Sequence, residues 1–508
     1  MGDMILVLDL GTSRLKSTLF SLEGKVLACE SASYPTDAPC PTWAEQDPAV
    51  WWSATVRATR AALATIGYDR DHSRGSIVGI GVTGQMHGLV LLDGSGAPLG
   101  SCLTLQDMRA VPEADAIDRD LGAGRVYSIT GARLDAASPA AKLRWLSRHR
   151  PELIARTAAV LSPKDYVRYL LTGHLATDPV DAAGTLLYDL RERRWSGEIA
   201  AAAGVPLQHL PPILPSHHLA GELSRDAAAA LSLSRGIPVA VGAGDDVECL
   251  GADLIAPGHA LEHLGSTGSI LACTPSIVID PAMRVDCYPH AVPDLYLVGG
   301  STSSAGAALA WAARNLVAVT GSQDSGASTN SLFFGDQLPA PNGSDPIFLP
   351  YLAGERCPLW DPDARGLLAG LTLRTTHQQI VRAIFAGVAF SLRHVLDTLL
   401  ELGLQIGEIV TSGNDQELAG SAWPVLRSTL YGRPLLMPEG GDPTALGTLI
   451  LTLVAIGRES DPVTATTAVV PRPMERVEPE ESSRAALEHR YQLYRTVAGA
   501  CADLFSPA

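Results

Sequence analysis

The chain has 508 residues, of which 46% are apolar and 18% are charged, so it can bury a large core and form roughly two to four domains. The formal net charge of −16 argues against a nucleic-acid backbone as the partner, because binding a chain of phosphates requires a basic face. A single nucleotide is compatible with this charge, since it needs only local hydrogen-bond donors and a metal ion.

Cysteine usage and the N-terminus indicate the compartment. The eight cysteines are scattered and include no CxxC pair, which is typical of reduced thiols in a cytoplasmic protein. Asp3 and Asp9 interrupt the first residues, so these do not form a signal peptide. The longest apolar run, near Leu446–Ile456, is too short to span a bilayer. We therefore expect a cytoplasmic protein with neither a membrane nor a nucleic acid as its partner.

Residues 4–20 predict a β-hairpin. Ile5–Leu8 is an apolar strand, Asp9 follows it, and Gly11-Thr12-Ser13 form the turn. Such a turn offers backbone N–H groups and two hydroxyls that can cradle a phosphate, with Asp9 placed to hold Mg²⁺ through water. It is not a Walker A loop, because the Gly-Lys-Ser ending is missing. The alternative is a plain hairpin that binds nothing.

Two polar segments follow in the first hundred residues. Residues 43–52, WAEQDPAVWW, form an aromatic-rich loop that enters a helix at Pro48. In residues 77–92, two apolar strands flank the stretch 84–88, which reads Gly-Gln-Met-His-Gly. His87 is either a satisfied histidine at the end of a strand or part of a ligand pocket.

The next segments are mainly structural in our interpretation. Residues 142–149 predict an amphipathic helix, and a further helix starts at Trp195-Ser196. Lys164, Asp165 and Asp178 are interpreted as structural ties rather than catalysts.

Residues 237–254 lie at the centre of the prediction. Ile237–Val241 reads as a buried strand, and the glycine-rich turn after it leads to Asp245 and Asp246. The carboxyl end of a buried strand is where α/β sheets bind ligands, so Asp245 is the candidate general base. The alternative is that both aspartates only cap the next helix.

A second hairpin is predicted over residues 261–273. Its turn again combines glycine and hydroxyl residues, and the stretch 264–267 echoes the stretch 10–13 of the first hairpin. Two such hairpins, one opening each half of the chain, predict two similar α/β domains that face a shared cleft. A nucleotide in this cleft would receive backbone donors from both sides.

The rest of the chain gives weaker local signals. Small residues open a helix within 299–314, a long helix is expected over 376–403, and a strand over 409–416. Residues 458–480 are rich in Pro and Thr and read as a loop or linker. The last helix is expected over 483–504.

These motifs resemble the FGGY family of carbohydrate kinases. The two hairpins are similar to that family's phosphate loops, Asp245 falls at its catalytic aspartate, and 354–366 (GERCPLWDPDARG) is similar to its most specific segment in the second half. The resemblance covers residues 4 to about 457 and implies two ribonuclease H-like α/β domains of the actin/hexokinase type flanking a catalytic cleft. It places a sugar-binding N-terminal domain at 1–247 and a nucleotide-binding C-terminal domain at 248–508.

The resemblance also implies roles for individual residues. It makes Asp245 the general base and Asp9 the carboxylate that holds Mg²⁺ through water. The residues implied for sugar binding are Met86, His87, Gly88, Gln106, Asp107, Asp245 and Asp246. Those implied for nucleotide binding are Gly11, Thr12, Ser13, Lys16, Gly265, Thr267, Gly268, Gly306, Gly413 and Asn414.

Several positions depart from the family's pattern. Leu105 replaces a tryptophan of the sugar pocket, and Ala310 replaces a glutamine that contacts the nucleotide in glycerol kinases. Of the family's adenine loop, only Gly413 is kept clearly. The sugar pocket and the adenine site are therefore the parts in which this chain differs most from the family.

The implied activity is ATP-dependent phosphorylation of a ketose, with D-xylulose and its 5-phosphate as the first choice because Met86-His87-Gly88 is what xylulokinases present to the sugar. Sedoheptulose, ribulose and gluconate are alternative acceptors. An actin- or Hsp70-like ATPase and a non-catalytic sugar- or nucleotide-binding protein are alternative functions. The expected partners are a small-molecule sugar, ATP and Mg²⁺, and the resemblance allows a homodimer.

Overall fold

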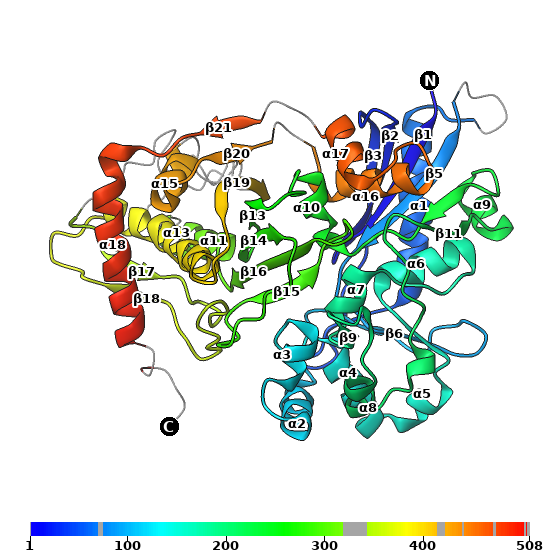
Figure 1. Ribbon diagram of the computed structural model, residues 1–508, viewed down its shortest axis with the longest axis horizontal. Coiled ribbons are helices and arrows are strands. Elements are labelled where there is room, and N and C mark those ends of the chain that lie inside the picture. The colour runs from blue at the N-terminus through cyan, green and yellow to red at the C-terminus, as the bar shows by residue number, and fades with distance from the viewer. Residues whose placement is uncertain are drawn as a thin grey trace.

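The computed structural model describes residues 2–69, 75–317, 343–413, 422–438, 441–470, 474–501 and 504. Figure 1 shows two sheets, each with its own helices, lying side by side. The first sheet has the order β11 (Leu219–Glu222), β12 (Pro238–Ala240), β5 (Ile77–Gly84), β1 (Met4–Leu10), β2 (Arg14–Ser21) and β3 (Val26–Ser33). The second has the order β15 (Asp286–Pro289), β16 (Tyr296–Thr302), β14 (Gly268–Thr274), β13 (Gly258–Leu264), β19 (Ile406–Gly413), β20 (Leu435–Met437) and β21 (Glu475–Val477).

The two sheets share one topology. In each, a predicted hairpin supplies two antiparallel strands, β1–β2 or β13–β14, and a third strand extends the antiparallel part. The first strand of each hairpin also pairs in parallel with a later strand, β1 with β5 and β13 with β19. The repeated glycine-hydroxyl turns in the sequence therefore mark two copies of one structural unit, as predicted.

β1 is apolar along its length because both of its faces are covered. Met4, Leu6 and Leu8 join the core under one face of the sheet, and Ile5 and Val7 join the core under the other. Successive strand residues point to opposite faces, so a strand without alternation indicates a sheet buried on both sides.

Helices from distant parts of the chain cover the first sheet. One face carries α1 (Pro48–Thr65), α6 (Pro163–Thr172) and α9 (Arg225–Leu231), and the other carries α16 (Pro443–Ala455) and α17 (Pro462–Val469). In Figure 1, the orange helices α16 and α17 lie against the blue strands of the N-terminal sheet. The last part of the chain thus returns to the first domain; the division at residue 247 stays a prediction.

The second sheet has its own helical cover, and an insertion extends the first half. Around the second sheet lie α11 (Gly306–Ala312), α13 (His377–Glu401), α15 (Ala422–Tyr431) and α18 (Glu481–Ala500), with a π-helical turn over Ala313–Val317 and the strand pair β17 (Ile347–Leu349) and β18 (Leu367–Ala369).

The insertion contains α2 (Val111–Leu121), α3 (Arg125–Thr130), α4 (Pro139–His149), α5 (Pro151–Arg156), α7 (Pro179–Gly184), α8 (Gly197–Ala203) and a 3₁₀ turn over Leu207–His209. The first half also has the short strands β4 (Glu45–Gln46), β6 (Val90–Leu92), β7 (Cys102–Leu103), β8 (Ala159–Leu161), β9 (Tyr188–Asp189) and β10 (Arg194–Trp195).

Two of the expected elements can be compared with the structure directly. α13 follows the prediction closely, because Thr376 caps its N-terminus and forms a capping box with Gln379. The prediction of a loop or linker over 458–480 is wrong, because α17 and β21 lie within it. Asp461 caps α17 and Pro462 occupies its first turn, so the proline that suggested a loop starts a helix.

Among the described helices, α13 alone is long and apolar enough to cross a membrane. In the structure, 78% of its most apolar window is buried, as expected for a core helix.

The two halves meet where α16 crosses α10 (Glu248–Gly251), which follows the 3₁₀ turn Asp245–Val247. A Cβ atom on Gly251 would lie 1.8 Å from the Pro443 carbonyl oxygen, and one on Gly447 would lie 2.1 Å from the Val247 carbonyl oxygen. The crossing therefore requires glycine on both helices. It ties the turn that carries Asp245 to the last part of the chain.

We predict that Gly447→Ala lowers the free energy of unfolding by about 1–3 kcal/mol, because its methyl group would overlap the Val247 carbonyl. Gly499→Ala in α18 is the matched control, since a Cβ there meets no atom within 4 Å. This control should gain about 0.5–1 kcal/mol from helix propensity. Denaturant unfolding of both variants tests the prediction, and equal stabilisation of the two would contradict the close crossing.

Candidate active site

A cavity of about 260 Å³ lies between the two halves of the chain. Its walls include residues that follow the glycine-rich turn after β12, residues that follow β5, and residues from the second sheet. The described residues that line it are Thr12, Gln85, Met86, His87, Leu105, Arg133, Asp135, Ala137, Ser138, Leu186, Asp245, Asp246, Asp286, Tyr288, Ser301, Arg356 and Trp360. The sequence prediction of a cleft shared by two domains agrees with this placement.

Asp245 and Asp246 enter the cavity because of a tight turn. Gly242 has φ 73°, and a Cβ there would lie 1.9 Å from the Val82 carbonyl oxygen, so only glycine allows the chain to pass β5 this closely. Neither aspartate side chain caps the helical turns that follow. The capping alternative is therefore not what the structure shows.

The two aspartates differ in their electrostatic surroundings. The Asp245 side chain is exposed in the cavity, but protein surrounds its carboxyl group. This loss of hydration raises the pKa of Asp245 well above the usual range, and the charges of Asp246 and Asp9 add to the shift. Burial also raises the pKa of Asp246 to about 6, with Glu248 adding to the shift and His263 opposing it. Both groups thus favour accepting a proton more than an ordinary aspartate does.

The first hairpin turn is held by an amide relay. Gln85 Nε2 donates to Gln46 Oε1 at 3.0 Å, and Gln46 Nε2 donates to the Thr12 carbonyl at 2.6 Å. Gln46 belongs to the WAEQDP segment and is fully buried. That segment therefore fixes the turn of Gly11, Thr12 and Ser13 relative to the cavity.

Asp9 and Lys16 lie beside this turn. Lys16 Nζ is 3.4 Å from Asp9 Oδ2 and donates to Asp442 Oδ2 at 2.8 Å. Burial raises the pKa of Asp9, Lys16 opposes the shift, and Asp442 adds to it. Two carboxylates thus face one ammonium group, a set of hard oxygen ligands that suits Mg²⁺.

The second hairpin turn has its own close backbone contacts. Gly306, at the start of α11, donates its N–H to the Gly265 carbonyl at 3.0 Å, and a Cβ on Gly306 would lie 2.5 Å from that oxygen. Gly413 ends β19 beside Leu264, where a Cβ would lie 2.2 Å from the Leu264 carbonyl oxygen. Gly265, Gly306 and Gly413, predicted separately, therefore gather around one turn. Asn414 lies outside the described residues.

Thr267 and Gly268 belong to the same hairpin. Thr267 accepts the Gly265 N–H through its carbonyl at 2.9 Å, which closes the turn. A Cβ on Gly268 would lie 3.0 Å from both Ala305 and Leu392, so this glycine serves packing behind the turn. Its contact with a nucleotide stays a prediction.

His87 forms one wall of the cavity in a fixed tautomer. Its Nδ1 is 2.7 Å from the Gly184 carbonyl, which can only accept, so Nδ1 carries the proton. Burial lowers the pKa of His87, so the ring is neutral and its Nε2 is an acceptor. The residue has φ 61°, a conformation that few non-glycine residues adopt.

A buried lysine keeps the His87 backbone in place. Lys142 Nζ donates to the His87 carbonyl at 2.8 Å and to the Thr104 carbonyl at 2.7 Å. Burial lowers the pKa of Lys142 to about 8. The sequence placed Lys142 on an amphipathic helix but gave no sign that it reaches the site.

Three residues expected to bind the sugar lie away from the cavity. A Cβ on Gly88 would meet Pro163 Cγ at 2.3 Å, so Gly88 is a packing position. Gln106 is exposed, and Asp107 is fully buried, where it accepts from the Ala44 N–H and from Arg109. In the structure Gly88 and Asp107 therefore support the walls of the site, and their contact with a sugar stays a prediction.

Arg109 is the centre of that support. Its guanidinium carbon lies 3.6 Å from the ring centroid of Trp43 and 5.1 Å from that of Trp145. It also contacts Glu45 Oε1 at 2.5 Å and Asp107 Oδ2 at 2.6 Å. This network fixes the loop that carries Leu105 into the cavity.

Sequence reasoning missed several residues of the cavity. Arg356 could have been predicted, because it belongs to the GERCP segment that resembles the family. In that segment, Glu355 accepts hydrogen bonds from Thr302 Oγ1 and from the Ser303 and Arg356 N–H groups. Arg133 and Trp360 stack at 5.0 Å although they are far apart in sequence. Asp286, whose pKa burial raises to about 7, lies on a strand with no distinctive pattern.

Comparisons with known proteins cover both halves of the chain. A sequence model of the N-terminal domain of the FGGY family of carbohydrate kinases matches residues 4–250, and one of its C-terminal domain matches residues 263–456. The xylulose kinase of Escherichia coli (strain K12) is 30% identical over 90% of this chain and 91% of its own length. The gluconokinase of Bacillus subtilis (strain 168) is 28% identical over 90% of this chain and 88% of its own.

Solved structures agree with the sequence comparisons. The crystal structure of a "xyloylose kinase" from Brucella ovis matches with a TM-score of 0.89 at 33% identity, over 99% of this chain and 100% of that one.

We predict that Arg109→Met lowers the free energy of unfolding by about 3–5 kcal/mol, because it leaves the buried Asp107 carboxylate without its cation. Gln106→Ala, three residues away on the exposed side of the same loop, should change it by less than about 0.5 kcal/mol. Denaturant unfolding of the two variants measures the difference. Equal, small effects would show that the Arg109 network is not needed to hold the loop.

Proposed function

Because the chain belongs to the FGGY family of carbohydrate kinases and is therefore a sugar kinase, we propose that it transfers the γ-phosphoryl group of ATP to O5 of D-xylulose. The observation that carries this proposal is the cavity in which His87 and Met86 share walls with Asp245, Asp246 and the first hairpin turn. The two ribonuclease H-like domains of the actin/hexokinase type, expected from the sequence, are the family's fold.

The chemical step needs a base aimed at the acceptor hydroxyl. The O5 proton passes to a carboxylate oxygen of Asp245 as O5 bonds to the γ-phosphorus. The bond between that phosphorus and the β–γ bridging oxygen breaks, and ADP leaves with the electron pair. The raised pKa of Asp245 makes it a stronger base for this transfer than an ordinary aspartate.

The two hairpin turns would neutralise charge on the phosphate oxygens. Backbone N–H groups of Gly11, Thr12 and Ser13 on one side, and of Ser266 and Thr267 on the other, are donors of fixed direction. Lys16 adds a positive charge next to the first turn. These donors are in place before the substrate binds, so little reorganisation is needed in the transition state.

Asp9 is the residue that would hold Mg²⁺ through water, with Asp442 on the other side of Lys16. When bound, the ion would supply positive charge to the β- and γ-phosphate oxygens. The raised pKa of Asp9, caused by burial with a contribution from Asp442, fits a carboxylate set that a cation stabilises.

The cavity offers a sugar both acceptors and donors. His87 Nε2, Asp135 and Asp286 can accept hydroxyl protons, while Arg356 can donate to hydroxyl or carbonyl oxygens. A site built to pair hydroxyl groups rejects analogues that lack them. Met86 supplies an adaptable apolar wall beside these groups.

Gluconate is the second candidate acceptor, and one observation favours it. Arg133 and Arg356 both line the cavity, and a guanidinium group suits a carboxylate. The Bacillus subtilis relative named a gluconokinase has nearly the same identity as the xylulose kinases. Leu105, in place of the family's tryptophan, also leaves room for a longer sugar.

We predict that Asp245→Asn lowers kcat by about 10²–10⁴-fold while the protein still binds sugar and ATP, because the acceptor hydroxyl loses its base. Asp246→Asn is the matched control and should lower kcat less than tenfold. Steady-state kinetics and equilibrium binding measure both. A normal kcat in Asp245→Asn, with a large loss in Asp246→Asn, would transfer the role to Asp246.

We predict that D-xylulose has the highest kcat/KM among D-xylulose, D-ribulose, L-ribulose, sedoheptulose, gluconate and glycerol. His87→Ala should lower kcat/KM for D-xylulose by about ten- to a hundredfold, the range for losing one buried hydrogen bond. An ATP-coupled assay over this panel gives both results. A tenfold preference for gluconate would support the second candidate, and an unchanged His87→Ala ranking would remove His87 from the sugar site.

A further inference from the structure

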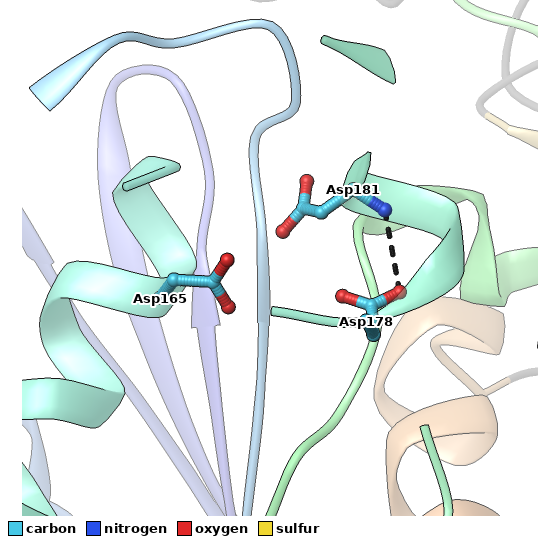
Figure 2. Close-up of side chains that lie close together, drawn as sticks. All are labelled: Asp165, Asp178 and Asp181. Atoms are coloured by element: carbon cyan, nitrogen blue, oxygen red, sulfur yellow. Dashed lines mark hydrogen bonds between the residues drawn. The ribbon is translucent and has the colours of Figure 1, made fainter. Parts of the chain in front are cut away.

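A second group of ionisable residues lies behind the catalytic turn, outside the cavity. Figure 2 shows Asp165 on α6, Asp181 on α7 and Asp178 at the N-cap of α7, with their carboxylates turned toward one another. All three are at least 98% buried. Asp181 also approaches the catalytic turn, because a Cβ on Gly244 would lie 3.1 Å from Asp181 Oδ1.

An ammonium group occupies the place that a metal ion would take among these carboxylates. Lys164 Nζ is 2.7 Å from Asp165 Oδ1, 2.8 Å from Asp178 Oδ2 and 3.4 Å from Asp181 Oδ2. Arg168 Nη1 lies 3.0 Å from Asp165 Oδ1. The group therefore contains two cations and three carboxyl groups.

This cluster is joined to the strand that leads to the base. Arg168 Nη1 donates to the Val241 carbonyl at 3.1 Å, and Lys164 Nζ lies 3.5 Å from the same oxygen. Val241 immediately precedes the turn that carries Asp245. The cluster thus fixes the start of the turn through Val241 and touches its end through Gly244.

The charges balance only when one carboxyl group carries a proton. Two cations offset two carboxylates, and a third buried negative charge without a partner would be strongly unfavourable. Asp165 contacts both cations, and Asp178 contacts Lys164 and accepts the Val180 and Asp181 N–H groups. Asp181 is the farthest of the three from Lys164, at 3.4 Å, and the only hydrogen bond to its carboxyl group among the described residues comes from the uncharged Ser162 hydroxyl, at 2.8 Å from Oδ2.

We propose that Asp181 holds a proton at neutral pH and acts as a positioning residue, keeping the cluster behind the catalytic turn electrically neutral so that Asp245 can ionise. This inference rests on the proposed role of Asp245 as the base. The groups that face Asp181 are Lys164, Asp165 and Arg168 from α6, Asp178 at the N-cap of α7, and Asp245 from the catalytic turn.

The electrostatics of both groups agree with this role. Burial, opposed by Lys164 and reinforced by Asp178 and Asp165, raises the pKa of Asp181 to about 8. A charge on Asp181 in turn raises the pKa of Asp245, in addition to the larger effects of enclosure and of Asp246. An ionised Asp181 would therefore keep a proton on the base and add a negative charge beneath the transferring phosphoryl group.

The first test needs no activity. Asp181→Asn is an isosteric, permanently neutral replacement. Because the pKa of Asp181 is higher in the folded chain than in the unfolded chain, its stabilising effect is complete below about pH 4 and is lost as the pH rises to about 8. The Tm of the variant minus that of the wild type should therefore increase steadily from pH 4 to pH 8. A difference that does not change with pH would overturn the proposal.

An infrared measurement and a control variant test the proposal without relying on the stability of Asp181→Asn alone. In infrared difference spectra at pH 7, the wild type should show the carbonyl stretch of a protonated carboxyl that Asp181→Asn lacks; absence of this band in the wild type contradicts the proposal. Asp165→Asn is the matched control, since Asp165 is ionised, and it should lower Tm strongly at every pH. Identical behaviour of the two variants would also contradict it.

The kinetic consequence distinguishes this inference from the proposed function. At pH 7, Asp181→Asn should keep kcat within about threefold of the wild type, and the decline of kcat above pH 8 should move to higher pH. A tenfold loss at pH 7 would show that the charge of Asp181 is required, and would overturn the proposal. If no sugar is phosphorylated, the proposed function fails. The unfolding and infrared measurements still show whether Asp181 holds a proton at neutral pH.

Discussion

The site depends on how the fold compensates the negative charges around the turn that carries Asp245. Asp245 must lose its proton to act as a base, yet the surrounding protein and the neighbouring carboxyl groups all oppose its ionisation. The fold keeps these neighbouring carboxyl groups and gives most of them a basic partner. Lys16 pairs with Asp9, Lys164 and Arg168 pair with the cluster behind the turn, and His263 lies 2.9 Å from Glu248. The cavity keeps its carboxylates because these partners lie outside it.

The same leucine–glycine backbone contact occurs beside both hairpin turns that face the cleft. Leu10 ends β1 against Gly84, and Leu264 ends β13 against Gly413, so each hairpin turn is aligned by a glycine at the end of the parallel neighbour strand. A side chain at either glycine would overlap the leucine backbone. The two sheets therefore present their turns in the same way, which suits a ligand with several phosphate groups between them.

Local sequence signals predicted the hairpins, the strand before Asp245 and the helix capped by Thr376. Each of these depends on neighbours in the chain: apolar runs, glycine turns and capping residues. The burial of Asp107 away from the cavity could not be predicted, because its surroundings are set by packing: the same loop supplies Arg109, but the indole of Trp145 comes from a helix far along the chain. Arg133 and Asp286 could not be found at all, since only tertiary folding brings them to the cavity.

Identification of the product by nuclear magnetic resonance tests the account most directly. The protein would be incubated with ATP, Mg²⁺ and D-xylulose, and the phosphorus signal correlated with the sugar protons. We predict one phosphomonoester on C5, formed together with one ADP per sugar, and no ADP formation when the sugar is omitted. Release of ADP and inorganic phosphate at the same rate with and without sugar would contradict a base aimed at a sugar hydroxyl.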